Sequence, residues 1–174
     1  NTPNLRELQE ESFIKDLFAR LSPIAKKPII FKIAPDMDDD KAVQICKTAV
    51  ESGAKGVIVN NTSIDYSLSK SANLQNFGGL SGKVIAKRSR ELFKAVASEL
   101  YGKTVLIASG GIDSAEEAYS RIKSGANLVQ IYTSFIFKGP SIAKRINEGI
   151  LKLLKEDNFA SIGEAVGCEI KNKI

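Results

Sequence analysis

Residues 103–134, KTVLIASGGIDSAEEAYSRIKSGANLVQIYTS, contain the pattern that decides the fold of this chain. An apolar run at Thr104–Ala108 is followed by the turn Ser109-Gly110-Gly111 and then by a helical pattern at Ser114–Lys123. A second apolar run, Asn127–Ile131, leads into Tyr132-Thr133-Ser134. This order predicts a β-α-β unit, and parallel strands joined in this way bring both turns to one end of a sheet.

A phosphate group is a natural ligand for two such turns, because backbone N–H groups at the ends of strands can cradle an anion. In a (β/α)8 barrel, the turns after strands seven and eight often have this role. The alternative for Ser109-Gly110-Gly111 is a tight turn that only needs positive φ. The second turn, one β-α unit later, favours the phosphate interpretation.

The composition limits the classes of protein that need to be considered. The chain has 174 residues, of which 43% are hydrophobic and 26% charged, as in a globular domain with a real core. It has no histidine, which excludes histidine triads and histidine-ligated metals within these residues. Lysine and arginine give a net charge of +5 but are scattered along predicted helices, so we do not expect nucleic-acid binding. Cys46 falls on an apolar helix face and is expected to be a packed thiol.

The rest of the chain alternates helices and strands. Apolar periodicity predicts helices at Leu5–Leu21, Asp39–Ser52, Val84–Tyr101 and Pro140–Lys155, with a short helix after Asp157. Strands are predicted at Pro28–Ile33 and Lys55–Val59. Strict alternation indicates an α/β fold with a parallel sheet. Four predicted strands are the number expected for half of a (β/α)8 barrel. An open flavodoxin-like sheet is the alternative, although its edges would need covering.

Polar residues follow each of the first two strands. Lys32 is either a lysine that snorkels from a strand end or a cation directed at an anionic ligand. Asn60-Asn61-Thr62-Ser63 either binds a polar ligand or makes a turn, and the long connection at 61–82 that follows favours a functional loop. Asp38-Asp39-Asp40 suggests a metal, but capping of the next helix explains these carboxylates better.

Several motifs resemble those of the dihydroorotate dehydrogenase family, in the family's order and nearly from end to end. They are Asn1-Thr2-Pro3-Asn4-Leu5-Arg6-Glu7-Leu8-Gln9, Lys32-Ile33-Ala34-Pro35-Asp36, Asn61-Thr62, Gly78-Gly79-Leu80-Ser81-Gly82, Gly110-Gly111-Ile112 and Leu128-Val129-Gln130-Ile131-Tyr132-Thr133. The stretch Gly82–Arg90 and the turn Phe137-Lys138-Gly139-Pro140 are similar to the quinone-dependent class 2 enzymes.

The resemblance implies a (β/α)8 TIM barrel that binds FMN, of which residues 1–174 supply about strands five to eight of a single domain. The implied FMN-binding residues are Lys32, Asn60, Gly82, Gly111, Tyr132 and Thr133, with the last three residues around the phosphate. Asn60 stands where the family often has threonine, and Ser109 where a small residue is common. Asn1, Asn61 and Thr62 are implied to bind dihydroorotate or orotate.

The family reaction oxidises dihydroorotate to orotate in pyrimidine (UMP) biosynthesis: a base removes a proton from C5 while C6 passes a hydride to the flavin. The class 2 base is a serine two residues before the Asn-Thr-Pro motif, so we expect it upstream of Asn1, together with the other half of the barrel and the segment that binds quinone. The resemblance also implies peripheral association with the bacterial cell membrane, on its cytoplasmic side. Alternatives are another phosphate-binding barrel enzyme, such as an isomerase or synthase, and a half barrel without catalytic activity.

Overall fold

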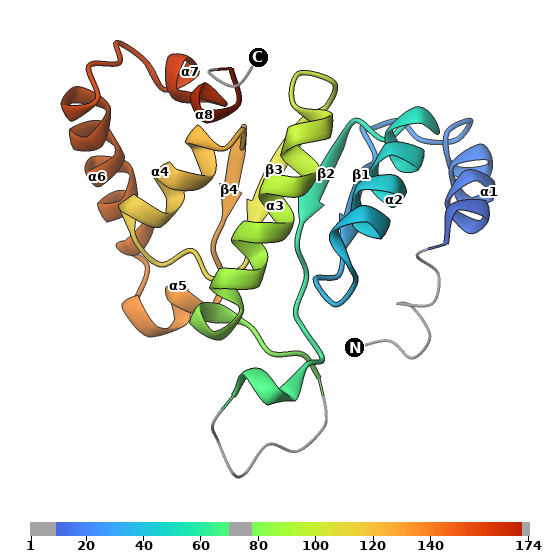
Figure 1. Cartoon of the computed structure of the whole chain (residues 1–174), viewed down its shortest axis with the longest axis horizontal. Coiled ribbons are helices and arrows are strands. Elements are labelled where there is room, and N and C mark those ends of the chain that lie inside the picture. Colours follow the sequence, from blue (N-terminus) through green and yellow to red (C-terminus); the bar gives the residue numbers. More distant parts are fainter. Residues whose placement is uncertain (1–9, 70–77, 172–174) are drawn as a thin grey trace.

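A four-stranded parallel sheet organises the structure, a computed structural model that describes residues 10–69 and 78–171 (Figure 1). Its strands are β1 (Ile30–Ile33), β2 (Gly56–Val59), β3 (Val105–Ser109) and β4 (Leu128–Gln130). They are paired in the order β1-β2-β3-β4, which is the order of the chain. A flavodoxin-like sheet would change direction at a switch point, and this sheet does not, so that alternative is wrong and the barrel interpretation holds.

The helices follow the predicted alternation, with a few differences at their ends. They are α1 (Glu11–Leu21), α2 (Asp39–Glu51), α3 (Ala86–Leu100), α4 (Ala115–Lys123), α5 (Thr133–Lys138), α6 (Ile142–Glu156), α7 (Ile162–Ala165) and α8 (Cys168–Lys171), with 3-10 turns η1 (Tyr66–Leu68) and η2 (Gly82–Ile85). The first part of the expected helix at Leu5–Leu21 lies outside the described residues. None of the helices in the described part of the chain has the length and apolar content needed to cross a bilayer.

Helix α2 shows how the local sequence fixes an element. Asp38 caps it, since the Asp38 Oδ1 accepts a hydrogen bond from the Lys41 backbone N–H at 2.8 Å. Asp39 and Asp40 occupy the first turn, where acidic side chains favour the helix dipole. Its inner face is apolar and includes Cys46, which is fully buried. The capping role predicted for Asp38-Asp39-Asp40 is therefore confirmed.

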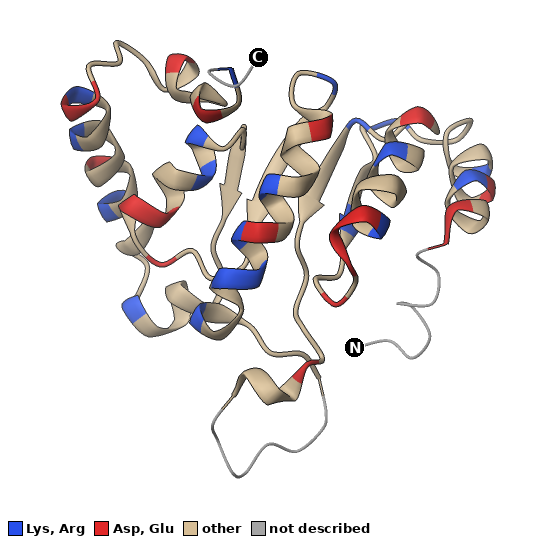
Figure 2. Cartoon of the chain, viewed as in Figure 1, with Lys and Arg blue, Asp and Glu red and all other residues tan. Residues whose placement is uncertain are grey.

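The two faces of the sheet differ sharply in burial. Side chains that point toward the helices are fully buried, among them Val57, Val59, Leu106 and Ala108. On the opposite face Ile30, Val105 and Leu128 are 43%, 40% and 57% exposed, whereas Ile107 is buried. The register aligns Lys32, Ile58, Ile107 and Leu128 in one row across this uncovered face. In Figure 1 the helices α2 and α3 lie in front of the sheet, and Figure 2 shows that the charged residues lie mainly on the helices. The uncovered face is the one that would point to the inside of a barrel.

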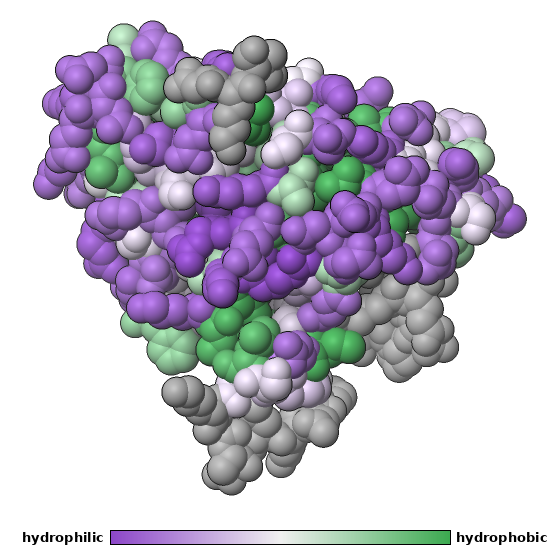
Figure 3. All heavy atoms as spheres, viewed as in Figure 1, coloured by the Kyte–Doolittle hydropathy of each residue, from purple (hydrophilic) through white to green (hydrophobic). Residues whose placement is uncertain are grey.

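Helix α5 is a feature that the sequence pattern misses. The pattern predicts a turn at Tyr132-Thr133-Ser134, but Thr133 begins a six-residue helix that ends at Lys138, with Gly139 as its C-cap. Ile136 and Phe137 on this helix are 66% and 84% exposed. Figure 3 shows apolar surface low in the view, in the region of α5 and η2. A helix this short and this exposed has no buried stripe by which periodicity could reveal it.

Candidate functional site

A cavity of about 800 Å³ lies at the carboxyl ends of the strands. It is lined by eight of the nine predicted site residues: Lys32, Asn60, Asn61, Thr62, Gly82, Gly111, Tyr132 and Thr133. The ninth, Asn1, lies outside the described residues. Because carboxyl ends of parallel strands meet at one edge of a sheet, residues separated by a hundred positions in the chain come together here.

The cavity is cationic. Lys32, Lys83 and Lys138 line it, and Asp113 is the only acidic side chain among its lining residues in the described part of the chain. Lys138 Nζ donates to the Asp113 backbone oxygen at 2.6 Å and lies 3.4 Å from its Oδ2. Within residues 10–69 and 78–171 no group of three His, Cys, Asp or Glu side chains is placed to hold a metal ion. The charge of the cavity suits an anionic organic ligand.

Lys32 reaches the cavity from β1. It alternates with the fully buried Ile33, so it points to the uncovered face of the sheet, in the same row as Ile58 of β2. Its side chain is exposed and lies among the residues that line the cavity. This placement supports a cation directed at a ligand over a lysine that merely snorkels from a strand end.

Asn60 is a buried polar residue whose hydrogen-bonding capacity is only partly used. It is 2% exposed, and its Nδ2 donates to the Asn61 backbone oxygen at 2.5 Å. Its Oδ1 is buried without a partner among the described residues. A buried acceptor without a donor costs free energy, roughly 1–3 kcal/mol, so a donor on a bound ligand would stabilise this site.

The loop after Asn60 is held by a carboxylate from the preceding β-α connection. Ser63 Oγ donates to Asp36 Oδ1, and the Ile64 backbone N–H donates to Asp36 Oδ2 at 3.1 Å. Ser63 also forms an antiparallel bridge with Leu80. These contacts fix the segment that carries Asn61 and Thr62, so their side chains are presented to the cavity on an anchored loop.

Three turns come together at the end of the cavity where the sequence predicts the phosphate, and they carry Gly82, Gly111 and Thr133. Gly82 has φ of +81°, and a Cβ on it would lie 2.8 Å from Thr133 Cγ2. The Thr133 hydroxyl donates to Ser81 Oγ at 2.8 Å. Gly111 has φ of +76°, and a Cβ there would lie 2.5 Å from Ala86 Cα. The three turns are therefore in close contact with one another or with the start of α3, and only glycine permits this approach.

Sequence reasoning misses the contributions of Lys83, Asp113 and Lys138 to the cavity. Lys138 belongs to the Phe137-Lys138-Gly139-Pro140 stretch, which the sequence predicts only as a turn. Its position shortly before the amphipathic helix α6 gives no sign that it turns back to Asp113. The sequence signal for a site residue is a charged or polar side chain directly after a strand, and Lys138 lacks it because it is the last residue of α5 and not the first residue after β4.

Comparison with known proteins identifies the family. The family model for dihydroorotate dehydrogenase matches residues 1–154. The chain belongs to the dihydroorotate dehydrogenase family. A protein from a Nitratiruptor species named dihydroorotate dehydrogenase (quinone) is 60% identical over 171 residues, which is 98% of this chain and 48% of the relative. A protein of the same name from Helicobacter acinonychis (strain Sheeba) is 45% identical over 98% of the chain and 48% of its own length.

Solved structures of dihydroorotate dehydrogenase share the fold. The crystal structure of the enzyme from Eimeria tenella in complex with ferulenol superimposes with a TM-score of 0.86 at 30% identity, covering 97% of this chain and 51% of that one. The chain thus spans about half the length of the dihydroorotate dehydrogenase relatives it matches. Its four β-α units correspond to half of a (β/α)8 barrel.

Proposed function

We propose that these residues are the FMN-binding and substrate-binding part of a dihydroorotate dehydrogenase that oxidises dihydroorotate to orotate in pyrimidine biosynthesis and uses a quinone as acceptor. They would form the C-terminal part of one barrel domain. The observation that carries the proposal is the convergence of eight implied ligand-binding residues on one cationic cavity. The relatives named dihydroorotate dehydrogenase (quinone) support the choice of acceptor. A peripheral position at the cytoplasmic side of the bacterial membrane is part of the same proposal.

The cavity fits FMN in size and in chemistry. About 800 Å³ is within the range of small-molecule sites, roughly 300–1,000 Å³. The Asn60 Oδ1 has no donor among residues 10–69 and 78–171. Gly82 and Gly111 leave room for a ligand to approach the backbone at positions where a Cβ would collide with neighbouring atoms. FMN, when bound, would take up the two electrons of dihydroorotate and pass them to the quinone.

Each residue would have a distinct role toward these ligands. Gly82, Gly111, Tyr132 and Thr133 would hold the phosphate-bearing cofactor. The Lys32 ammonium would stabilise negative charge that develops near it, since a cation already in place needs no reorganisation when that charge appears. Asn61 and Thr62 supply donors and acceptors for the polar pyrimidine ring. The base is expected to be the serine that precedes Asn1 in the family motif.

The test uses the full-length polypeptide, with the upstream half that the relatives contain. We expect the purified protein to carry a flavin that is released on denaturation with the mass of FMN. We also expect it to form orotate with a soluble quinone but not with fumarate or NAD. Asn61→Ala should abolish orotate formation and retain FMN, while Asn147→Ala, at an exposed position of α6 outside the cavity lining, serves as the matched control.

Other outcomes point to other functions. Protein without flavin, or with flavin but without orotate formation, would refute the proposal and favour a different phosphate-binding barrel enzyme. Residues 1–174 alone are expected to form no orotate, because the uncovered sheet face exposes Ile30, Val105 and Leu128. Turnover by this segment alone would mean that the base has been assigned to the wrong place.

A further inference from the structure

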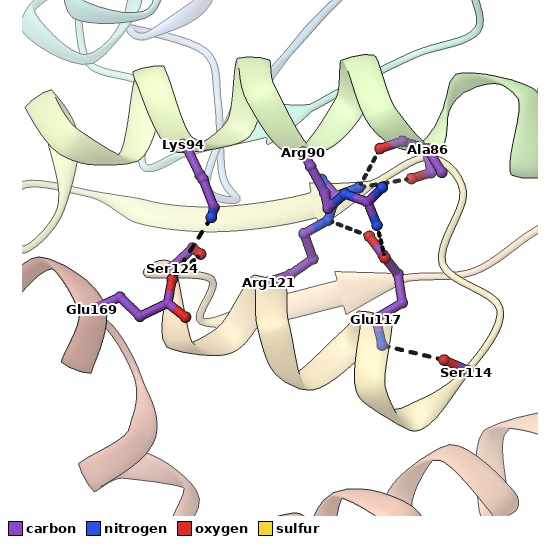
Figure 4. Close-up of polar contacts among 9 residues, drawn as sticks. Ala86, Arg90, Lys94, Ser114, Glu117, Arg121, Ser124 and Glu169 are labelled. Carbon is purple, nitrogen blue, oxygen red and sulfur yellow. Dashed lines mark hydrogen bonds and ion pairs between the residues drawn. The ribbon is translucent and has the colours of Figure 1, made fainter.

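Arg121 carries a guanidinium group in the interior of the protein. It is 1% exposed and projects from α4 toward the start of α3 and the turn after β3 (Figure 4). It is not among the residues that line the cavity. Arginine is rarely buried to this extent unless it is paired and hydrogen-bonded. Its contacts therefore indicate what it does.

Those contacts join three segments. Arg121 Nε donates to Glu117 Oε1 at 2.9 Å, one turn earlier on α4. Arg121 Nη2 donates at 3.2 Å to the backbone oxygen of Ala86 and at 3.2 Å to that of Gly110. Glu117 Oε2 also accepts from Arg90 Nη1 of α3 at 2.5 Å. Figure 4 shows the side chains of Arg121, Glu117 and Arg90 turned toward one another between α3 and α4.

Packing alone does not account for this buried ion pair. Burial lowers the pKa of the Arg121 guanidinium, and the hydrogen bond and charge of Glu117 oppose that change. Well-packed apolar side chains often replace such pairs without loss of stability. What an apolar side chain cannot do is donate hydrogen bonds to two carbonyl oxygens from different segments, which the planar guanidinium does here.

Both carbonyl oxygens belong to segments at the phosphate end of the cavity. Ala86 follows η2, which begins at Gly82, and Gly110 precedes Gly111. Gly110 and Gly111 have consecutive positive φ values, 94° and 76°, and no side chains of their own to restrain them. The conformation of this turn therefore depends on contacts from its surroundings, and Arg121 supplies one from the side away from the cavity.

We propose that Arg121 is a positioning residue that fixes the spacing between the Gly82 and Gly111 segments for the phosphate of the ligand, an inference that rests on the proposed FMN function. A flavin without phosphate does not depend on this spacing. Arg121 therefore sets the preference for FMN over riboflavin, and it does so without touching the ligand.

The experiment measures that preference directly. FMN and riboflavin are titrated separately into the flavin-free full-length protein, and flavin fluorescence gives a dissociation constant for each. In Arg121→Met we expect FMN binding to weaken by about tenfold, the effect of one or two hydrogen bonds from a charged donor, and riboflavin binding to change by less than about twofold. Arg121→Lys, which keeps a donor, should recover part of the preference.

Arg90→Met is the matched control. Arg90 pairs with Glu117 but contacts neither Ala86 nor Gly110 in the hydrogen bonds of the described residues. This variant should retain the wild-type preference. If Arg121→Met leaves Glu117 too poorly compensated to fold, the double variant Arg121→Met, Glu117→Gln removes both charges and gives the same measurement.

The outcomes separate this inference from the function on which it rests. If the ratio of the dissociation constants for FMN and riboflavin is unchanged in the Arg121 variants, including when binding of both flavins weakens equally, the positioning role is overturned and the FMN assignment is left intact. Wild-type protein that binds neither flavin would overturn the proposed function and this inference with it. Selective loss of FMN affinity, with Arg90→Met unchanged, supports the inference.

Discussion

Substitution of Gly111 by alanine tests whether the phosphate end of the cavity depends on a close approach of two backbones. A Cβ at this position would lie 2.5 Å from Ala86 Cα and 3.0 Å from Ala86 N. The neighbour is the backbone of the first residue of α3 and not a flexible side chain, so it cannot simply rotate away. Gly102 is the matched control, because its φ is also +76° and a Cβ there would meet nothing within 4 Å.

The two substitutions share one cost and differ in another. Alanine with positive φ loses about 1 kcal/mol at either site. At Gly111 the turn must also move by about 1 Å before the new contact reaches the 3.4 Å of ordinary van der Waals approach. Overpacking of this kind costs about 1–3 kcal/mol more. We therefore expect the free energy of unfolding of Gly111→Ala to be about 1–3 kcal/mol lower than that of Gly102→Ala.

Urea unfolding of the full-length protein, monitored by circular dichroism, gives the free energy of unfolding of each variant, and the two values are compared at a common m-value. Flavin titration supplies the second readout, because only the Gly111 turn lines the cavity and only its displacement should weaken FMN binding. Equal stability of the two variants, or unchanged FMN affinity in Gly111→Ala, would refute the reasoning.

Other contacts in the described residues support three more predictions. Lys32→Ala should slow single-turnover orotate formation by more than tenfold, roughly the effect of one preorganised charge, with little change in urea midpoint; an unchanged rate with a lower midpoint would make Lys32 structural. Asp36→Ala should raise the KM for dihydroorotate about tenfold without changing FMN affinity, because the loop that carries Asn61 and Thr62 loses the hydrogen bonds from Ser63 and Ile64 to Asp36. A variant that loses affinity for FMN as well as for dihydroorotate would contradict this prediction. Burial raises the pKa of the Cys46 thiol from its ordinary 9.0 to about 12, so stability is retained below pH 9 and falls as the pH rises toward 12. In urea titrations at alkaline pH, Cys46→Ala should lose less of its free energy of unfolding between pH 9 and pH 12 than the wild type does. An equal loss in the variant would show that groups other than Cys46 cause the decrease.

The strands and long helices could be predicted from the sequence because burial determines them. Val57 and Val59, like Leu106 and Ala108, lie in short apolar runs, as expected for a parallel sheet that helices cover. Strand ends were less predictable. The apolar pattern assigns Pro28 and Ile131 to strands that in fact begin at Ile30 and end at Gln130, because apolar character continues past the point at which ladder hydrogen bonds stop.

The site was predictable where polar residues directly follow a strand and unpredictable where they do not. Asn60 follows β2 directly and lines the cavity, as this logic requires. Lys138 reaches the cavity only by way of α5, whose existence periodicity could not indicate. In the sequence, Arg121 looks like one half of an ordinary i,i+4 pair with Glu117 on a helix surface. Its burial arises from packing between α3 and α4, which no local pattern reveals.

The agreement between strand order and chain order has a consequence for biosynthesis. Each strand from β2 onward pairs with the strand that left the ribosome immediately before it, so the sheet can extend in the direction of translation without any segment threading past another. The slowest step in such a sequence is the pairing of β2 with β3, because the connection at 61–82 and helix α3 must be synthesised between them. A nascent chain that pauses before Val105 would expose the unpaired edge of β2, to which another extended chain could pair.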